Sequence, residues 1–358
     1  MLRGSSSIAE VALRKSTYGR PMRFPGGGSW LRELTRREPL SASTDTLIVG
    51  GTGELEPLAV PIVRVGPRGH RLQAVLVTIR PRQWIKNGLV VGAAGAAGAL
   101  GHDDVPVRVA LACVAFCLLA SGIYAVNDVC DAPEDRRHPR KRHRPVAAGE
   151  LDPRAALALG GAMMLSGLGL CALVRWPLLI VGGGYLALTL SYTLFWRQVA
   201  ILDVLAIAGG FVLRAIAGGE AAPVALSRWF VLVVTFVAVF VAAGKRQAEL
   251  RRTAGTGVSG RRALKLYTPA RLRAIVAGSS FAALFAYCVW AFELPEVHGI
   301  PWRPLTIVPF AACLARYAAL VRAGGGEAPE DALLRDRYLQ AAALAWLLLF
   351  ALGVHAAG

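Results

Sequence analysis

The segment from residue 105 to residue 144 decides the fold class: VPVRVALACVAFCLLASGIYAV (105–126) followed by NDVCDAPEDRRHPRKRHR (127–144). The first part is apolar and has the length, about 20 residues, that crosses the hydrocarbon core of a bilayer. Four polar side chains then recur at helical spacing: Asn127, Asp128, Asp131 and Asp135. Steps of three and four residues place the aspartates on one face of a helix, with the asparagine beside them. The stretch predicts a membrane-spanning helix with an acidic face at its end.

The acidic face is directly followed by a basic run. Its members are Arg136, Arg137, His138, Arg140, Lys141, Arg142, His143 and Arg144. Carboxylates so close together repel one another unless a cation lies among them, and oxygen ligands favour Mg²⁺ or Mn²⁺ with positions left for phosphates. We therefore predict a metal site at Asp128, Asp131 and Asp135 that binds a diphosphate. The alternative is a solvated loop whose positive charges only mark the cytoplasmic side, and the acidic repeat argues against it.

Composition indicates a polytopic membrane protein. Of 358 residues, 55% are hydrophobic and 18% are charged, whereas about 25% of a soluble domain is charged. The net charge of +17 falls between apolar blocks, where anionic lipid headgroups and phosphorylated substrates would meet it. We therefore expect no nucleic-acid partner. The six cysteines contain no CxxC pair, and we interpret them as reduced residues that pack helices.

Two regions are expected along the chain. Residues 1–66 are rich in Ser, Gly, Pro and Arg and lack apolar periodicity, so we predict a disordered extension. Residues 67–358 are expected to form an all-α catalytic bundle that crosses the membrane nine times. The predicted spans are 85–101, 107–127, 155–174, 178–195, 200–218, 228–245, 272–292, 303–322 and 338–357. Closely spaced Gly and Ala in several spans allow tight helix contacts and permit a homo-oligomer, such as a trimer, without specifying it.

The loops between the predicted spans differ in charge. Loops 128–154 and 246–271 are rich in Arg and Lys, whereas the loops assigned to the opposite side contain only Arg175 as a basic residue. The positive-inside rule then places the N-terminus in the cytoplasm. An odd number of spans places the C-terminus outside, and the acidic motif faces the cytoplasm from the cell membrane.

Other polar residues lie near the same predicted face. In RPRQWIKN (80–87), Arg82 and Lys86 either anchor the chain at the headgroups or hold a lipid phosphate. Asp203 lies within an apolar run, where a carboxylate is costly and is a functional candidate that could face the first cluster. Lys245 either pairs with Glu249, four residues on, or holds a phosphate. We expect a structural role for Arg214, paired with Glu220.

Several motifs resemble the UbiA superfamily of intramembrane transferases. NDxxDxxxD, at Asn127 to Asp135, is common to the superfamily. The longer form NDVCDAPEDRRHPRKRHRPVAAGEL is similar to the branch that makes decaprenyl-phosphate phosphoribose. Four further stretches share that similarity: RPRQWIKN (80–87), LDVLAIAGGFVLRAIAGG (202–219), AAGKRQAEL (242–250) and LLRDRYLQ (333–340). The resemblance implies a nine-helix UbiA-type bundle with cytoplasmic active-site loops.

The resemblance also implies substrates and a cofactor. The donor would be 5-phosphoribosyl diphosphate, the acceptor decaprenyl phosphate or a similar polyprenyl phosphate, and the cofactor Mg²⁺, or Mn²⁺ in its place. The product would serve the synthesis of cell-wall arabinan, including that of arabinogalactan. The branch shows YxxxxK before the aspartate at 203, and here Tyr192 is followed by Arg197, which keeps the charge but changes the phosphate geometry.

These inferences combine into one hypothesis about the site. Asn127 and the three aspartates would hold the metal and orient the donor diphosphate. Basic residues would bind the phosphates: Lys141, Arg144, His138 and Arg140 for the donor, and Lys86 and Arg82 for the lipid. Asp203 would position a ribose hydroxyl or help to hold the metal. The alternatives are a UbiA-type prenyltransferase acting on a quinone precursor or haem, a lipid-phosphate transporter and a scaffold for cell-wall enzymes.

Overall fold

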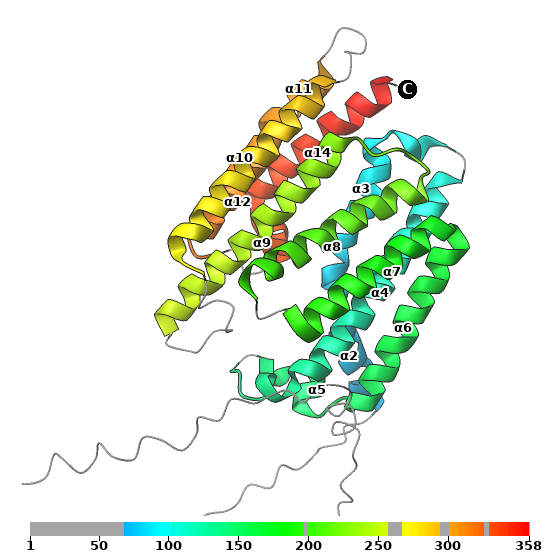
Figure 1. The fold of residues 1–358 in the computed structure, drawn as a ribbon, viewed down its shortest axis with the longest axis vertical. Coiled ribbons are helices and arrows are strands. Elements are labelled where there is room, and N and C mark those ends of the chain that lie inside the picture. Colours follow the sequence, from blue (N-terminus) through cyan, green and yellow to red (C-terminus); the bar gives the residue numbers. More distant parts are fainter. Residues whose placement is uncertain are drawn as a thin grey trace, which may run out of the picture. The chain divides into compact units, whose positions relative to one another are not determined.

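The computed structural model describes residues 68–102, 104–139, 141–196, 199–256, 267–293, 301–325 and 329–357 (Figure 1). The regular elements in these ranges are helices. In the first half they are α2 (Arg68–Ile79), η1 (Pro81–Asn87), α3 (Gly88–Ala96), η2 (Ala99–Gly101), α4 (Val105–Asp135), η3 (Lys141–His143), α5 (Pro145–Ala148), α6 (Pro153–Val174), α7 (Trp176–Ser191) and η4 (Tyr192–Trp196). The second half comprises α8 (Ala200–Ala221), α9 (Arg228–Thr256), α10 (Pro269–Glu293), α11 (Trp302–Leu305), α12 (Ile307–Arg322), α13 (Pro329–Arg335) and α14 (Arg337–Ala357). The extension predicted at 1–66 lies outside the described residues.

Seven helical segments of the described chain are long and apolar enough to cross a membrane. They are Val105–Asp135, Pro153–Val174, Trp176–Trp196, Leu202–Ala221, Arg228–Arg251, Pro269–Glu293 and Trp302–Arg322, with a shorter apolar helix at Arg337–Gly353. The first predicted span, 85–101, is not one helix, because it is divided among η1, α3 and η2. Gly98 has a φ of 69°, a left-handed conformation that ends the helical path and that glycine adopts at little cost. The protein is a multi-pass membrane protein, and the count of nine spans stays a prediction.

The acidic motif lies within α4 itself. The predicted membrane span ends at residue 127, and the acidic face that follows it is helical as predicted, because the helix continues through Asp135. Tertiary packing explains this extension, because Val129 and Ala132 are buried in a small core with Val146 of α5 and Ala156 of α6. Pro133 is tolerated in the last turn, where its missing N–H and its ring disturb only the end of the helix.

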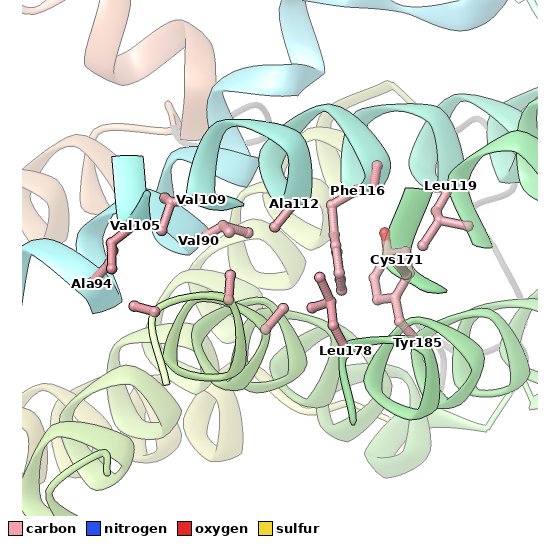
Figure 2. Packing of buried hydrophobic residues seen from close by; sticks show 14 of the residues in the cluster. Val90, Ala94, Val105, Val109, Ala112, Phe116, Leu119, Cys171, Leu178 and Tyr185 are labelled. Atoms are coloured by element: carbon pink, nitrogen blue, oxygen red, sulfur yellow. The ribbon is translucent and has the colours of Figure 1, made fainter. Parts of the chain in front are cut away.

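The main hydrophobic core is built around α4 (Figure 2). Phe116 and Leu119 are fully buried and face Leu178 and Tyr185 of α7. The rings of Phe116 and Tyr185 lie 5.2 Å apart between centroids, within the range of favourable aromatic contacts. This packing holds the α4 backbone that carries the acidic motif.

Small residues allow the helices to approach closely, as predicted from the closely spaced Gly and Ala in several spans. A Cβ atom on Gly122 of α4 would lie 2.6 Å from the carbonyl oxygen of Gly160 on α6. On α3 the alanines rather than Gly92 make the close contact, because Gly92 has open space around it whereas Ala93 is fully buried. The partner helix there is α8, where a Cβ on Gly218 would lie 2.1 Å from the carbonyl oxygen of Val90.

Two glycines of α6 provide a test of this packing. We expect Gly167→Ala to destabilise the protein, because the new Cβ would lie 2.8 Å from Leu119 and 2.9 Å from the carbonyl oxygen of Ala115. Overpacking of this kind costs roughly 1–3 kcal/mol. Gly169→Ala is the matched control, since nothing lies within 4 Å of its Cβ position. Thermal unfolding in detergent should show a lower Tm for the first variant alone, and equal Tm values would refute the close packing.

Candidate metal and phosphate site

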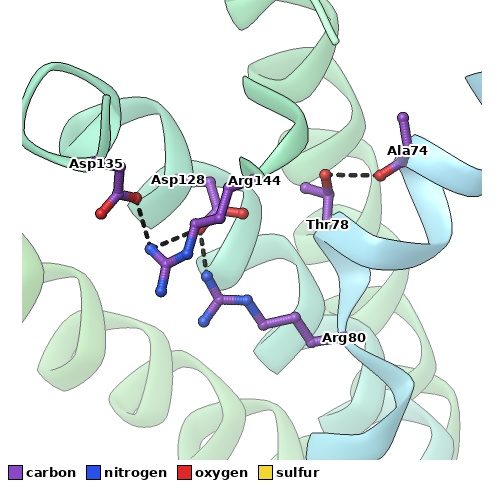
Figure 3. A network of polar contacts seen from close by, with 6 residues as sticks. All are labelled: Ala74, Thr78, Arg80, Asp128, Asp135 and Arg144. Atoms are coloured by element: carbon purple, nitrogen blue, oxygen red, sulfur yellow. Dashed lines mark hydrogen bonds and ion pairs between the residues drawn. The ribbon is translucent and has the colours of Figure 1, made fainter. Parts of the chain in front are cut away.

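Asp128 is the centre of the polar cluster at the end of α4. Its side chain is only 2% exposed, and two arginines from different parts of the chain bind it (Figure 3). Arg80, which lies between α2 and η1, donates a hydrogen bond to Oδ1 of Asp128. Nη1 of Arg144, which precedes α5, lies 3.4 Å from the same oxygen. A buried carboxylate requires such charged partners because desolvation of an unpaired charge is very costly.

Arg144 also connects Asp128 with the last acidic residue of the motif. Its Nη1 donates a hydrogen bond of 2.7 Å to Oδ2 of Asp135, which is buried as well (Figure 3). The two carboxylates, seven residues apart in the chain, therefore converge on one cationic group. This confirms that the helical spacing places Asp128 and Asp135 on a common face.

Arg80 has an unusual backbone conformation. Its φ of 52° and ψ of 63° are left-handed values, which are uncommon for a residue other than glycine. Ser121 of α4 maintains this conformation through contacts with residues before and after Arg80 in sequence. Its hydroxyl donates a hydrogen bond to the carbonyl oxygen of Ile79 at 2.9 Å and accepts one from Trp84 Nε1 at 3.0 Å. The guanidinium lies 4.8 Å from the ring centroid of Tyr124, a cation–π distance. The local backbone is thus fixed so that Arg80 reaches Asp128.

Arg82, two residues after Arg80 in the same motif, was predicted to bind the lipid phosphate with Lys86, and that role stays a prediction. In the structure the side chain of Arg82 is 71% exposed, and its described partner is Asp331 of α13, 3.8 Å away. The spacing alone could not distinguish the two arginines, because the turn at Arg80 decides which of them points toward α4.

The donor atoms near Asp128 fit a divalent cation. The Oδ1 atom of Asn127 is buried and has no hydrogen-bond partner among the described residues, and the Asp128 and Asp135 carboxylates already meet at a positive charge. Asp131 is half-buried and makes contacts of its own. Within the described ranges, no three His, Cys, Asp or Glu side chains are already gathered around one point. The assignment of Asp128, Asp131 and Asp135 as metal ligands stays a prediction.

The basic loop after α4 continues this cluster. The backbone N–H of Lys141 donates to Nδ1 of His138 at 3.3 Å, which closes a turn at the start of η3. The side chain of Lys141 is half-buried and also makes contacts. Arg140 lies outside the described residues. Of the four loop residues predicted to bind phosphate, the structure thus brings Arg144 into direct contact with the aspartates.

Lys86 lies in a second polar group on η1. Its Nζ donates a hydrogen bond to Oε1 of Gln83 and lies 3.3 Å from Oε2 of Glu330 on α13. Burial raises the pKa of Glu330, but the charge of Lys86 and the hydrogen bond from Gln83 outweigh it and hold that pKa below its usual value. Sequence reasoning missed Glu330, because an acidic residue in the first turn of a short helix has an ordinary role there.

Asp203 lies in a third group, at the beginning of α8. Tyr192 donates a hydrogen bond to its Oδ1, and the buried Arg246 of α9 forms an ion pair with its carboxylate. Arg246 also forms an ion pair with Glu249, and the predicted pair between Lys245 and Glu249 stays a prediction. The positive charge of Lys245 also helps to lower the pKa of Glu330. Arg197 lies outside the described residues.

The predicted pairing of Arg214 with Glu220 is wrong. Arg214 is buried and donates to Asn87 Oδ1 at 2.7 Å, to the hydroxyl of Tyr185 at 2.6 Å and to the carbonyl oxygen of Gly210 at 2.9 Å. The backbone carbonyl of Glu220 accepts a hydrogen bond from Arg175. Arg214 is thus a buried cation whose described hydrogen-bond partners are neutral.

Known proteins share this fold and sequence. The pattern that defines the UbiA prenyltransferase family matches residues 88–339. The decaprenyl-phosphate phosphoribosyltransferase of Corynebacterium glutamicum is 39% identical over 295 residues, which cover 81% of this chain and 89% of the relative. That of Mycobacterium tuberculosis strain H37Rv is 39% identical over 285 residues, covering 78% of this chain and 94% of the relative.

Solved structures agree on the fold. A UbiA homolog from Archaeoglobus fulgidus bound to GPP and Mg²⁺ has a TM-score of 0.61 and 16% identity, covering 79% of this chain and 98% of the homolog. The same homolog bound to Cd²⁺ has a TM-score of 0.59. Because the family pattern covers most of the chain and the helices superpose on a member of known structure, this chain belongs to the UbiA prenyltransferase family.

Proposed function

We propose that the protein transfers 5-phosphoribose from phosphoribosyl diphosphate to decaprenyl phosphate, forming decaprenylphosphoryl-5-phosphoribose and diphosphate. The observation that carries this proposal is the 39% identity, over nearly their whole length, to proteins named decaprenyl-phosphate phosphoribosyltransferase. Similarity to the A. fulgidus homolog supports the fold alone, since its identity is 16%.

The described side chains fit a reaction between two phosphorylated substrates. Asp128 and Asp135 supply oxygen ligands, and Arg80 and Arg144 supply positive charge at the same point. The positive charges of Lys86 and Lys245 both lower the pKa of the Glu330 carboxylate, so the two lysines lie near each other. Guanidinium and ammonium groups bind phosphate oxygens strongly, and the planar guanidinium does so with two parallel hydrogen bonds.

In the proposed reaction the bond between ribose C1 and the diphosphate oxygen breaks, and an oxygen of the lipid phosphate forms the new bond to C1. The electron pair of the broken bond leaves with the diphosphate, so Arg80 and Arg144 would stabilise the charge that develops there. Lys86 would orient the lipid phosphate on the opposite face of the ribose, which inverts the configuration at C1. A phosphate oxygen is already anionic at neutral pH, so this attack requires no general base.

A divalent cation would be held by Asp128, Asp131 and Asp135, with Asn127 beside them. When bound, Mg²⁺ or Mn²⁺ would neutralise negative charge on the diphosphate as it departs. The A. fulgidus homolog, which shares the fold, was solved with Mg²⁺ and with Cd²⁺ bound. Arg144 would then exchange its contact with the carboxylates for one with the substrate.

The proposed location is the cell membrane, with the acidic motif on the cytoplasmic side, the N-terminus inside and the C-terminus outside. The basic loop after α4 and the basic end of α9 support this orientation through the positive-inside rule. The proposed product would supply ribose-derived units for cell-wall arabinan.

A paired-substrate assay tests the reaction. Purified protein with phosphoribosyl diphosphate, decaprenyl phosphate and Mg²⁺ should yield a lipid whose mass has increased by one phosphoribosyl group. Chelation of the metal with EDTA should abolish product formation, and added Mg²⁺ should restore it. In parallel, a prenyl diphosphate with an aromatic acceptor should give no product. Prenylation of that acceptor, without the phosphoribosyl lipid, would instead identify an aromatic prenyltransferase.

Substitution of Asp128 tests the acidic site. Asp128→Asn should reduce turnover on the order of 100-fold or more, because it removes a metal ligand and weakens the positions of Arg80 and Arg144. The matched control is Asp104→Asn at the opposite end of α4, where the side chain is 61% exposed and pairs with Arg108. The control should retain near-normal turnover and the same Tm. Near-normal turnover of Asp128→Asn at saturating Mg²⁺ would exclude the proposed role.

A further inference from the structure

Lys86 has one described anionic partner, and it comes from a distant part of the chain. Glu330 of α13 faces Lys86 through Oε2 at 3.3 Å, and its Oε1 accepts a hydrogen bond of 2.5 Å from Gln83. The Glu330 side chain is only 10% exposed. A carboxylate is costly to bury unless it neutralises a charge, so its partner is the lysine that it faces.

Of the two contacts that Glu330 makes with η1, the one with Lys86 is weaker than the one with Gln83. Oε2 of Glu330 is buried and has no hydrogen-bond partner among the described residues, although Lys86 is nearby. The ion pair is therefore electrostatic, without the geometry of a charge-assisted hydrogen bond. An incoming anion therefore has to displace a contact weaker than a charge-assisted hydrogen bond.

The surroundings of Lys86 contain more positive than negative charge. Arg80 and Arg214 lie within electrostatic range of Lys86. Arg80 is already paired with Asp128, whereas the described hydrogen-bond partners of Arg214 are neutral. The single carboxylate of Glu330 therefore leaves an excess of positive charge, which favours an additional anion.

The contact also determines how α13 is held. Glu330 binds Gln83 and Lys86 at one end of α13, and the exposed pair between Arg82 and Asp331 adds little. Beyond the other end, Asp336 accepts hydrogen bonds from Arg316 of α12, the shortest being 2.7 Å. Glu330 thus provides the buried polar contact between α13 and η1.

We propose that Glu330 is a positioning residue that serves as the counter-ion of Lys86 until the phosphate of the lipid acceptor replaces it. The inference rests on the proposed function, in which Lys86 binds that phosphate. A phosphate monoester carries about −1.5 to −2 charges at neutral pH, so it competes well with one carboxylate for the lysine. Before the lipid binds, Glu330 fixes the position of Lys86. After the phosphate replaces Glu330, the contact between α13 and η1 is weakened.

Binding of farnesyl phosphate, a short soluble analogue of the acceptor, tests the exchange without turnover. Glu330→Gln should bind this probe about fivefold or more tightly than the original protein, because a competing anion is removed. A purely structural residue would give weaker or unchanged binding. In a Lys86→Met background, Glu330→Gln should leave the Kd unchanged, since the cation for which the two anions compete is absent.

The control is Asp331→Asn, which removes the adjacent and more exposed carboxylate of α13. Its Kd should stay within twofold of that of the original protein. Equal or weaker binding by Glu330→Gln, or an equal gain in Asp331→Asn, would overturn the inference.

Hydrogen exchange of the unaltered protein provides a second test that does not depend on how the variants fold. Saturating farnesyl phosphate should speed amide exchange in α13 and leave α12 unchanged. Slower exchange in α13, or absence of binding, would overturn the inference. If the unaltered protein transfers phosphoribose but Glu330→Gln binds farnesyl phosphate with an unchanged Kd, only the counter-ion role is refuted. If Glu330→Gln binds the probe more tightly but the unaltered protein forms no phosphoribosyl lipid, only the proposed reaction is refuted.

Discussion

The structure depends on the neutralisation of buried carboxylates at the end of a membrane helix. Asp128 and Asp135 are nearly inaccessible to solvent, and an unpaired charge at such a position would be strongly destabilising. Arg80 and Arg144 supply the opposite charge from segments on either side of α4 in sequence. The left-handed backbone at Arg80 and the turn that leads into α5 bring both guanidinium groups to these carboxylates.

The same requirement connects the fold with the chemistry. Arginines that neutralise carboxylates in the free protein are also the groups that bind diphosphate, so a substrate can enter by exchange of ion pairs. The Lys86–Glu330 contact repeats this arrangement on η1, with a carboxylate from α13 in the place proposed for a phosphate. The Asp203–Arg246 pair differs because both side chains are almost fully buried and Tyr192 adds a further hydrogen bond. Such a pair is better suited to hold α8 against α9.

Much of the site could be predicted because it is local. The steps between Asn127, Asp128, Asp131 and Asp135 define a helical face wherever the segment forms a helix, and the structure confirms that it does. The family resemblance and the membrane-spanning character followed from contiguous motifs and apolar runs in the same way. The contact of Arg80 with Asp128 could not be predicted, because it depends on one backbone turn. Nor could the partners of Arg214, since Asn87 is 127 residues distant in sequence.

The helical membrane-protein class, the acidic face of α4 and the family of the chain can be derived from the amino-acid sequence without the structure. They depend on hydrophobicity, on periodicity over a few turns and on contiguous motifs, none of which requires knowledge of the neighbouring helices. The packing of the helices was needed to establish which cation meets which carboxylate, where the first predicted span is interrupted and how Glu330 reaches Lys86. Those contacts join residues far apart in sequence, and they form because a buried charge is stabilised by whichever opposite charge the packing of the helices brings within reach.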